Sequence, residues 1–520
     1  MAENLKAHGI VYLVGAGPGH PGLITRLGYE LLQHCDAVAY DALIPMELIA
    51  GLPDRVERHY VGKRAGKHSL PQSRINELLV ELAQRGLNVV RLKGGDPFIF
   101  GRSGEEAEHL AAAGIPVVMV PGVTAASAAA AMSGFSLTNR HAASWVFLAT
   151  GHGAESASIP VPWDQVAALP GGTLVIYMGL AKLDQLVGQL LSSGLAPETP
   201  AIVTQAASTG MQKSVEAPLA RLSSECKRRG LRPPALIIIG DAVQCRTDVL
   251  PAGSLAGKRI LVTSPPQSAI HFCELLRRQG AEPIPYPTVR ILPVDDTEGW
   301  AYCLGLIESR GLCLFSDDFA VGCFFDGLVA RGLDVRSLHT MKILAWGDAT
   351  RAALLRYGMK ADDVIDPSDS SELTRCTLRR DASESMPLIW VREDSVDPCL
   401  QSALDQLCRH IVPLVVCAHS TAGWEAHWAH ELIDNPPEYI CFTGIAEVEA
   451  LFELLGDDMA RHLAGKSCIA AQDGSVAEAL RKHGLTVEVK ANSDNIDAFV
   501  GALVRHSHEQ NSESLISRVC

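Results

Sequence analysis

Hydrophobic residues in the first half of the chain gather in short runs that end at a glycine or a small polar residue. The runs lie at Ile10–Val14, Ala37–Tyr40, Asn88–Leu92, Gly114–Gly122, Trp145–Ala149, Thr173–Met178, Ala201–Thr204 and Ala235–Ile239. Apolar runs of this length, bounded by turn residues, are typical of buried strands, and helical patterns separate them. The pattern predicts an α/β chain of alternating strands and helices, with its loops at one edge of the sheet.

The stretch Val90–Glu106 combines a buried strand, a sharp turn and a charged helix start. Gly94–Pro97 stops the strand with residues that free or fix φ, and Ser103 and Glu106 have the spacing of a capping box for the helix. Because glycine lacks Cβ, we expect a ligand to lie against bare amides here, with Asp96 accepting hydrogen bonds from its hydroxyl or amine groups. An ordinary strand-to-helix turn is the alternative.

A second glycine-rich turn, Gly15–Gly22, follows the first strand and suggests a phosphate-binding loop. Asp41 also lies near the distance at which a dinucleotide-binding fold places its ribose-binding acid. However, the glycines have the spacing G-x-G-x-G, and Pro18 and Pro21 prevent a helix from starting within the motif. A helix that begins nearer Leu23 leaves no N-terminus against a pyrophosphate, so an NAD-binding oxidoreductase is the weaker alternative.

Positive charges gather in the glycine-bracketed segment Val61–His68, which contains Lys63 and Arg64. Cations in a glycine-rich loop predict an acidic ligand, whereas cations on a helix are usually a solvated face. Four further cations add to the same sign: Arg74, Arg91, Lys93 and Arg102. The chain as a whole has a formal net charge of −14, which argues against nucleic acid as a partner because phosphate binding needs a basic surface.

The chain has 520 residues, of which 47% are hydrophobic, and this length suits about three or four domain-sized units. Met1–Gly9 has no signal pattern, and no apolar run is long enough to span a membrane, so we expect a cytoplasmic protein without a membrane partner. Fourteen cysteines form no C-x-x-C pair, and no histidine cluster has zinc spacing. We therefore expect reduced thiols and no metal.

A linker, Leu250–Gly257, precedes a second series of alternating strand and helix patterns. The expected strands lie at Lys258–Thr263, Leu312–Ser316, Met341–Gly347, Leu388–Val391, Tyr439–Thr443 and Ser467–Ala470. The strands that end in Phe315-Ser316 and Phe442-Thr443 are each followed by another strand with a glycine-containing turn. This weak internal repeat predicts two similar lobes.

Eight motifs of the first half stand in a fixed order: GAGPGHPGLIT, YDALI, VGKR, RLKGGDPFIFGRSGEE, PGVTAASAA, ATGH, YMG and IIIGDAV. In this order and spacing they resemble the uroporphyrinogen-III C-methyltransferase family of tetrapyrrole methylases, over roughly residues 10 to 246. The resemblance implies two α/β lobes that hold S-adenosylmethionine between them and a homodimer formed through this domain. It also implies methylation of uroporphyrinogen III at C2 and C7 to give precorrin-2.

The resemblance assigns roles to individual residues. Cofactor contacts, largely through backbone groups, are implied for Pro18, Gly94, Gly95, Asp96, Ile99, Thr124, Ala125, Met178 and Ala207. Lys63, Arg64 and Arg102 would meet the carboxylates of the tetrapyrrole macrocycle. Asp41 is the matched proton acceptor, with a structural turn acid as the alternative, and Lys63 is the matched proton donor. Arg102 and Glu105 complete the implied catalytic set; they lie one helical turn apart, so they either pair or leave Arg102 to the substrate.

Four positions depart from the pattern of the family. His20 stands where Asp is usual, Ser103 where Gly is usual, Asn139 where His is frequent and Gly210 where Pro is common. The His20 change removes one acidic group from the expected site. None of the four is an implied cofactor contact.

Six segments of the second half also stand in order: RILVTSPP, ELLRRQGAEPIPYP, LFSDDFA, WGDATRAALLRYGMKADDV, CFTGIAEV and AAQDGSVAEALRKHGLTVEV. Their order resembles, more loosely, that of uroporphyrinogen-III synthases over roughly residues 258 to 500. This implies two lobes with parallel sheets, joined by chain crossings near Tyr286–Ile291 and Ile411–Val416. The expected domains are thus 10–246, a linker 247–257, and 258–505, the last with one lobe of about 258–290 plus 413–505 and another of about 291–412.

Several side chains of this half differ from those usual in synthases. Ser264 stands where an arginine is usual, and Ser316-Asp317-Asp318 replaces an S-x-N pattern. Two hypotheses follow: this half closes hydroxymethylbilane to uroporphyrinogen III, or it is a degenerate lobe pair with a binding or structural role. The first is favoured because such function rests on the shape of the site more than on a motif. Candidate substrate-binding hydroxyls are Thr263, Ser316, Thr350 and Thr443, each of which could equally cap a turn.

Overall fold

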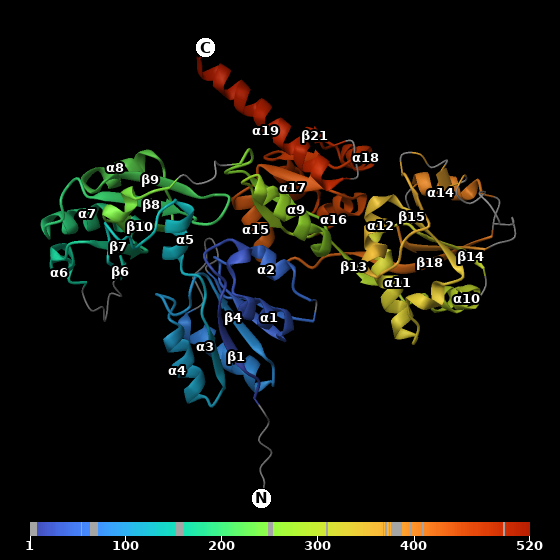
Figure 1. Cartoon of the computed structure of the whole chain (residues 1–520), viewed down its shortest axis with the longest axis horizontal. Helices are drawn as coiled ribbons and strands as arrows, with labels where there is room; N and C mark the ends of the chain where they lie inside the picture. The colour runs from blue at the N-terminus through green and yellow to red at the C-terminus, as the bar shows by residue number, and fades with distance from the viewer. Residues whose placement is uncertain are drawn as a thin grey trace, which may run out of the picture. The chain divides into compact units, whose positions relative to one another are not determined.

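A computed structural model describes residues 8–53, 55–62, 71–151, 161–247, 253–307, 310–367, 369, 372–373, 375, 387–395, 398–407, 410–491 and 495–519 (Figure 1). Four β-sheets with intervening helices make up this part of the chain, which confirms the expected α/β class. The chain divides into two compact units. One contains Met1–Tyr286, Glu425–Ile445 and Asp457–Cys520, and the other contains Pro287–Trp424 and Ala446–Gly456.

The first sheet is parallel and has the strand order β3-β2-β4-β1-β5. Its strands are β1 (Val11–Gly15), β2 (Ala37–Tyr40), β3 (Glu57–Tyr60), β4 (Val89–Lys93) and β5 (Val117–Val120). Its helices are η1 (Pro21–Leu23), α1 (Arg26–His34), α2 (Met46–Ala50), α3 (Gln72–Gln84) and α4 (Ser103–Ala112). Figure 1 shows α1 on one face of this sheet and α3 and α4 on the other. The central strand β4 is buried along its whole length because helices cover both of its faces.

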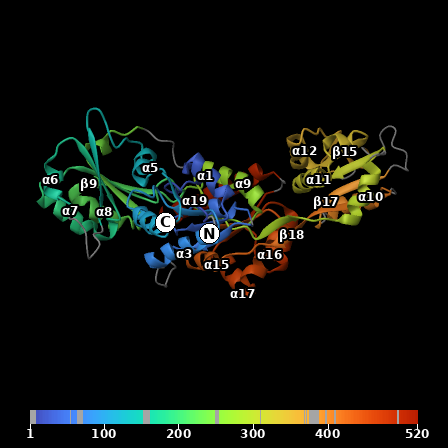
Figure 2. The ribbon, with the colours of Figure 1, turned by 90° about the horizontal axis from the view of Figure 1, so that it is seen from below.

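The second sheet, of order β6-β7-β10-β8-β9, is mixed. Its strands are β6 (Trp145–Thr150), β7 (Gly172–Tyr177), β8 (Pro200–Gln205), β9 (Lys213–Pro218) and β10 (Ala235–Ile239). Its helices are α5 (Ala125–Met132), α6 (Trp163–Ala168), η2 (Leu180–Lys182), α7 (Leu183–Ser192), α8 (Leu219–Arg228) and η3 (Asp241–Gln244). Figure 2 shows α5 across the sheet from α7 and α8, and successive residues of β10 accordingly alternate between the two apolar cores.

The third sheet, in the same unit, is parallel with the order β12-β11-β19-β20-β21. Its strands are β11 (Arg259–Val262), β12 (Glu282–Pro285), β19 (Tyr439–Phe442), β20 (Cys468–Ala471) and β21 (Val489–Lys490). The helices of this region are α9 (Pro266–Arg278), α15 (Ala426–Asp434), α17 (Asp457–Ala464), α18 (Gly474–Lys482) and α19 (Ile496–Val519). Leu255, within the expected linker, is fully buried in the core of this region.

The other unit holds a six-stranded sheet of order β13-β18-β17-β14-β15-β16, parallel except for the pairing of β13 with β18. Its strands are β13 (Val289–Pro293), β14 (Gly311–Phe315), β15 (Met341–Trp346), β16 (Asp363–Ile365), β17 (Leu388–Glu393) and β18 (Ile411–Thr421). Its helices are α10 (Thr297–Ile307), α11 (Asp318–Ala330), η4 (Val335–Leu338), α12 (Gly347–Arg356) and α14 (Pro398–Asp405), and α16 (Ile445–Leu455) belongs to it from Ala446 onward. The sequence places the second chain crossing at Ile411–Val416, whereas these residues lie inside β18 and the units divide at Trp424/Glu425.

Three glycines bring the loops after β1, β4 and β5 into direct backbone contact. Gly17 and Gly95 form an antiparallel bridge, in which the Gly95 amide donates to the Gly17 carbonyl at 2.7 Å. A Cβ on Gly122 would lie 2.4 Å from the Gly95 carbonyl oxygen and 2.8 Å from Cα of Gly15. Because real Cβ atoms do not approach a backbone this closely, the three loops meet only where side chains are missing.

We predict that Gly122→Ala lowers the free energy of unfolding by about 1–3 kcal/mol, because the added methyl group forces backbone apart. Urea denaturation monitored by fluorescence measures the change. Gly188→Ala in α7 is the matched control: a Cβ there meets nothing within 4 Å. In a helix interior, Ala is favoured over Gly by about 1 kcal/mol, so equal effects of the two changes would contradict the packing argument.

Candidate functional site

Five loops at the carboxyl ends of β1, β4, β5, β7 and β8 form the candidate site, which we call the loop cluster: residues 15–22, 94–102, 121–125, 178–179 and 206–210. Tyr177, the last residue of β7, connects three of these loops. Its hydroxyl lies 2.5 Å from Oγ1 of Thr124 and accepts a hydrogen bond from the Ala126 amide at 3.2 Å. Its ring lies 5.0 Å from that of Phe100. Burial raises the pKa of Tyr177, so its hydroxyl remains a hydrogen-bond donor at neutral pH.

Backbone strain concentrates in the loop cluster. Five non-glycine residues in the described ranges have a left-handed φ, and all five lie here: Phe100 (54°), Arg102 (59°), Met178 (54°), Ala206 (47°) and Ser208 (66°). Such conformations are unfavourable for residues with a Cβ and persist where the surrounding structure enforces them. Their gathering in loops from both sheets is the pattern expected of a binding site.

The loops of the first and second sheets also touch directly. The His20 amide donates to Oγ of Ser208 at 3.2 Å, and a Cβ on Gly19 would lie 3.2 Å from the Ala207 carbonyl oxygen. His20 itself accepts from the Gly22 amide through Nδ1 at 3.0 Å, because desolvation and the charge of Arg277 hold its pKa below the ordinary value. The loop that contains Pro18 is therefore in contact with the loop that contains Ala207.

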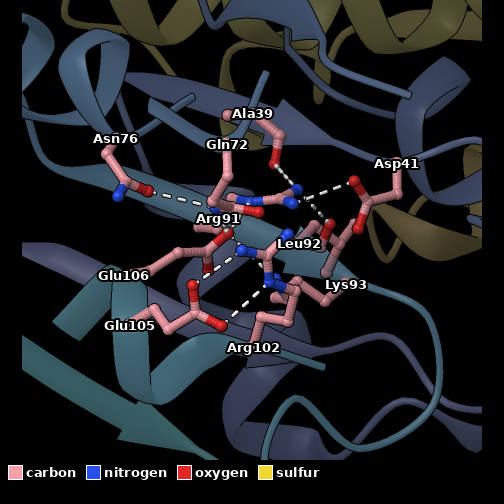
Figure 3. Close-up of polar contacts among 10 residues, drawn as sticks. All are labelled: Ala39, Asp41, Gln72, Asn76, Arg91, Leu92, Lys93, Arg102, Glu105 and Glu106. Carbon is pink, nitrogen blue, oxygen red and sulfur yellow. Dashed lines mark hydrogen bonds and ion pairs between the residues drawn. The ribbon is translucent and has the colours of Figure 1, made fainter. Parts of the chain in front are cut away.

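A largely buried network of polar and charged side chains joins β4, α3 and α4 to Asp41, which follows β2 (Figure 3). Oε1 of Glu106 accepts from Nζ of Lys93 at 2.9 Å, from Nε2 of Gln72 at 3.0 Å and from Nε of Arg91 at 3.3 Å. Nη2 of Arg91 also donates to Oδ1 of Asp41 at 2.9 Å. The side chains of Arg91 and Glu106 are 2% and 0% exposed, so their charges are stable only as a paired group.

The network is incompletely satisfied at Glu106. Oε2 of Glu106 and Oγ of Ser103 are buried and accept or donate no hydrogen bond within the described part of the chain. Burial, and then the charge of Arg91, lower the pKa of Lys93. An unpaired buried oxygen carries a desolvation penalty, so the stability of the buried Glu106 carboxylate depends on the hydrogen bonds that its other oxygen accepts.

The expected capping box is wrong. Helix α4 begins at Ser103 itself, with Arg102 as the N-cap in a left-handed conformation and no side-chain cap. Glu106 turns inward to Lys93 and Arg91 and does not reach back to the helix start. Two buried cations on the neighbouring strand bind the carboxylate by charge-assisted hydrogen bonds, which are stronger than a bond from a neutral backbone amide.

Three of the cations that add to the positive charge of the first half, Arg74, Arg91 and Lys93, pair with carboxylates of the chain itself. Arg91 and Lys93 are buried and paired within the network, and Arg74 pairs with Glu77 on the exposed face of α3. Arg91 and Lys93 occupy alternate positions of β4, a strand buried on both faces. Because buried cations need partners, this pattern could have predicted that both residues form internal ion pairs. Gln72 and Tyr177 carried no such signal.

Arg102 and Glu105 form the pair that the sequence left open. Nε and Nη2 of Arg102 donate to the two carboxylate oxygens of Glu105 at 2.9 and 2.7 Å. Both side chains are more than half exposed, so the pair contributes little stability and can open toward a ligand. Lys63 and Arg64 lie outside the described residues.

The implied cofactor residues all lie in the loop cluster. Both carboxylate oxygens of Asp96 accept backbone amides, Oδ1 from Phe98 at 2.7 Å and Oδ2 from Gly122 at 3.1 Å. Asp96 thereby fixes the loop that contains Gly94, Gly95 and Ile99, and a direct contact to a ligand stays a prediction. Thr124 is the N-cap of α5, Ala125 is its first residue, and Met178 is 50% exposed.

The predicted hydroxyls of the second half are engaged within their own units. Oγ1 of Thr263 donates to the Cys441 carbonyl at 2.9 Å, and Oγ1 of Thr443 lies 2.9 Å from Oγ of Ser264. In the other unit, Oγ of Ser316 donates to Oδ2 of Asp317 and Oγ1 of Thr350 donates to the Trp346 carbonyl. Ligand contacts by the four hydroxyls stay predictions.

An acidic cluster surrounds Ser316. Burial and the charge of Glu393, at the end of β17, raise the pKa of Asp317 to about 7. Burial also raises the pKa of Glu393, whose Oε2 lies 3.5 Å from Nε2 of His419.

Within the described residues, no group of three or more His, Cys, Asp or Glu is arranged to hold a metal ion, and no helix there is long and apolar enough to cross a lipid bilayer.

We predict that Glu106→Gln lowers the free energy of unfolding by about 3 kcal/mol, because it leaves two buried cations undercompensated. Glu105→Gln, one residue earlier, removes an exposed partner and is expected to change it by less than about 1 kcal/mol. Urea denaturation of both variants measures the difference. Similar values for the two variants would show that the network does not hold α4 against β4.

Two family models match the chain: Tetrapyrrole (Corrin/Porphyrin) Methylases over residues 10–223 and Uroporphyrinogen-III synthase HemD over residues 271–501. The "Porphyrin biosynthesis protein HemD" of Ruminiclostridium josui is 32% identical over 502 residues, which are 96% of this chain and 98% of that protein. The "Siroheme synthase" of Stutzerimonas stutzeri is 46% identical over 251 residues, and the match spans 47% of this chain and 54% of that enzyme.

Among solved structures, the uroporphyrin III C-methyl transferase of Thermus thermophilus is 39% identical to this chain, with a TM-score of 0.39. The match spans 46% of this chain and 100% of the Thermus protein. The Ruminiclostridium protein matches nearly the whole chain, and this match shows the family. The chain therefore belongs to the bifunctional enzymes of tetrapyrrole biosynthesis, with a tetrapyrrole methylase domain in its first half and a uroporphyrinogen-III synthase domain in its second.

Proposed function

We propose that the first half transfers methyl groups from S-adenosylmethionine to uroporphyrinogen III at C2 and C7, giving precorrin-2. The observation that supports this most is the loop cluster, in which strained loops from two sheets meet around Tyr177. A crystal structure of the Thermus thermophilus uroporphyrin-III C-methyl transferase is a complex with S-adenosyl homocysteine, and 37% of its matched residues are identical here.

The residues present suit such a cofactor. The left-handed turns at Met178 and Ala206 direct backbone groups out of the regular sheet pattern, where they can meet a nucleoside or an amino acid. Phe100 and Met178 are exposed apolar side chains beside Tyr177, and they would cover the apolar parts of the ligand. The bound cofactor supplies a sulfonium methyl group that an electron-rich pyrrole carbon attacks.

The macrocycle carries many carboxylates, and we assign their binding to Arg102, Lys63 and Arg64. The exposed pair of Arg102 with Glu105 would exchange for a pair with a substrate carboxylate. Asp41 would accept the proton that leaves the macrocycle, and Lys63 would donate one. Arg91 holds Asp41 in place from below, so the carboxylate is oriented before substrate arrives. A cytoplasmic homodimer formed through this domain is part of the proposal.

We predict that Asp41→Asn reduces methyl transfer by at least about 100-fold while S-adenosylhomocysteine still binds, because the amide cannot accept the proton. Mass analysis of the product from uroporphyrinogen III and labelled methyl donor measures turnover, and calorimetry measures binding. Asp36→Asn is the control, since Asp36 precedes β2 whereas Asp41 follows it. Turnover of Asp41→Asn near that of the unaltered enzyme would remove Asp41 from the mechanism.

We further propose that the second half closes hydroxymethylbilane to uroporphyrinogen III with inversion of its last ring. The match to the synthase family over residues 271–501 supports this activity. A binding or structural role is the second candidate, and the acidic cluster around Asp317 favours it. Among its described residues, the cluster offers a substrate with many carboxylates no cation beyond His419, and Ser264, in place of an arginine, binds Thr443.

The intact chain, incubated with hydroxymethylbilane and no methyl donor, is expected to yield the inverted isomer, uroporphyrinogen III. Chromatography of the oxidised products separates the two isomers, and a reaction without protein gives the background. Formation of the uninverted isomer alone would exclude synthase activity and leave the binding or structural role.

A further inference from the structure

Gly210 joins the loop between β8 and β9 to residues beyond the methylase domain. Its amide donates to Oε2 of Glu282 at 2.7 Å, and its carbonyl accepts from the Gly257 amide at 3.0 Å. A Cβ on Gly210 would lie 2.3 Å from the Ala281 carbonyl carbon. Both backbone groups of one residue are therefore used across the domain boundary, inside one compact unit.

The fastened loop is the one that contains the implied cofactor residue Ala207. Its left-handed residues Ala206 and Ser208 lie two to four positions before Gly210. Within the loop, Oγ1 of Thr209 donates to the Ala206 carbonyl at 2.9 Å, so the strained residues and Gly210 form a short, internally bonded turn. Holding Gly210 thus restrains Ala207 as well.

The anchoring side belongs to the third sheet. Glu282 is the first residue of β12, and Ala281 before it is buried. Burial raises the pKa of Glu282, while the hydrogen bond from Gly210 lowers it. A second contact lies nearby, where Arg277 of α9 forms a largely buried ion pair with Glu47 of α2.

The contact between Gly210 and Glu282 explains why glycine suits position 210. Proline is common in the family at the position of Gly210, but proline has no amide hydrogen to give to Glu282. Any side chain there would also meet the Ala281 backbone. Glycine is the residue that allows both the hydrogen bond and the close approach.

We propose that the synthase domain holds the cofactor loop of the methylase domain, with Glu282 and Gly210 as positioning residues for S-adenosylmethionine. The inference rests on the proposed methyltransferase function. Neither residue needs to touch the cofactor, since both act through the conformation of residues 206–208. The fused domain thereby becomes part of the methylase site.

Calorimetric titration of the full chain with S-adenosylhomocysteine tests the proposal. Glu282→Ala is expected to weaken binding roughly tenfold, because it removes a charge-assisted hydrogen bond that orders the loop. Glu282→Gln is expected to stay within about threefold of the unaltered chain, since its amide oxygen still accepts from Gly210. KM for S-adenosylmethionine should rise with Glu282→Ala while kcat at saturation stays near normal. Gly210→Ala provides an independent disruption and should also weaken binding.

Glu438→Ala is the matched control. Its Oε2 accepts the Arg259 amide at 2.7 Å at the start of β11, which is the same kind of bond in the same sheet but away from the cofactor loop. Equal binding by Glu282→Ala and the unaltered chain would overturn the proposal, as would equal weakening by Glu438→Ala. If the unaltered chain itself does not bind S-adenosylhomocysteine, the proposed function fails first, and the two failures are thus distinguishable.

Discussion

The pairing of Glu106 with Lys93 and Arg91 is the interaction on which the methylase domain most depends. These charges lie between the central strand and helix α4, where desolvation would exclude each of them alone. Glu106 lies in the first turn of α4, so these contacts join the start of the helix, next to Arg102, to β4. Through Arg91 the same group reaches Asp41, so one buried network orients side chains on two loops.

The loop cluster combines two opposite backbone requirements. Gly17, Gly95 and Gly122 allow loops to pack against one another without side chains. Met178, Ala206 and Ser208 carry a Cβ in conformations that normally favour glycine. The first group makes the junction rigid, and the rigid junction is what can hold the second group in strained conformations.

The two halves of the chain are joined by more than a linker. Leu255 is buried in the core of the third sheet, and Gly210 bonds to the side chain of Glu282 and to the amide of Gly257. Under the proposed reactions, the product of the synthase domain is the substrate of the methylase domain. Fusion then has a structural consequence as well as joint expression, because one domain supports a loop of the other.

The sequence alone determined the α/β class, the main buried strands and the membership of both halves in their families. Apolar runs such as Ile10–Val14 and Ala235–Ile239 are local signals, and the order of motifs can be read without knowledge of contacts.

Only the tertiary structure decided the partners of Glu106 and Gly210. The spacing of Ser103 and Glu106 suits a capping box and a buried pair equally, and Glu282 lies 72 residues after Gly210. The polar edge strands β3 and β9 likewise carry no apolar run, because their faces are only partly buried. Local patterns record which residues avoid water, whereas pairing across the fold depends on which buried groups meet.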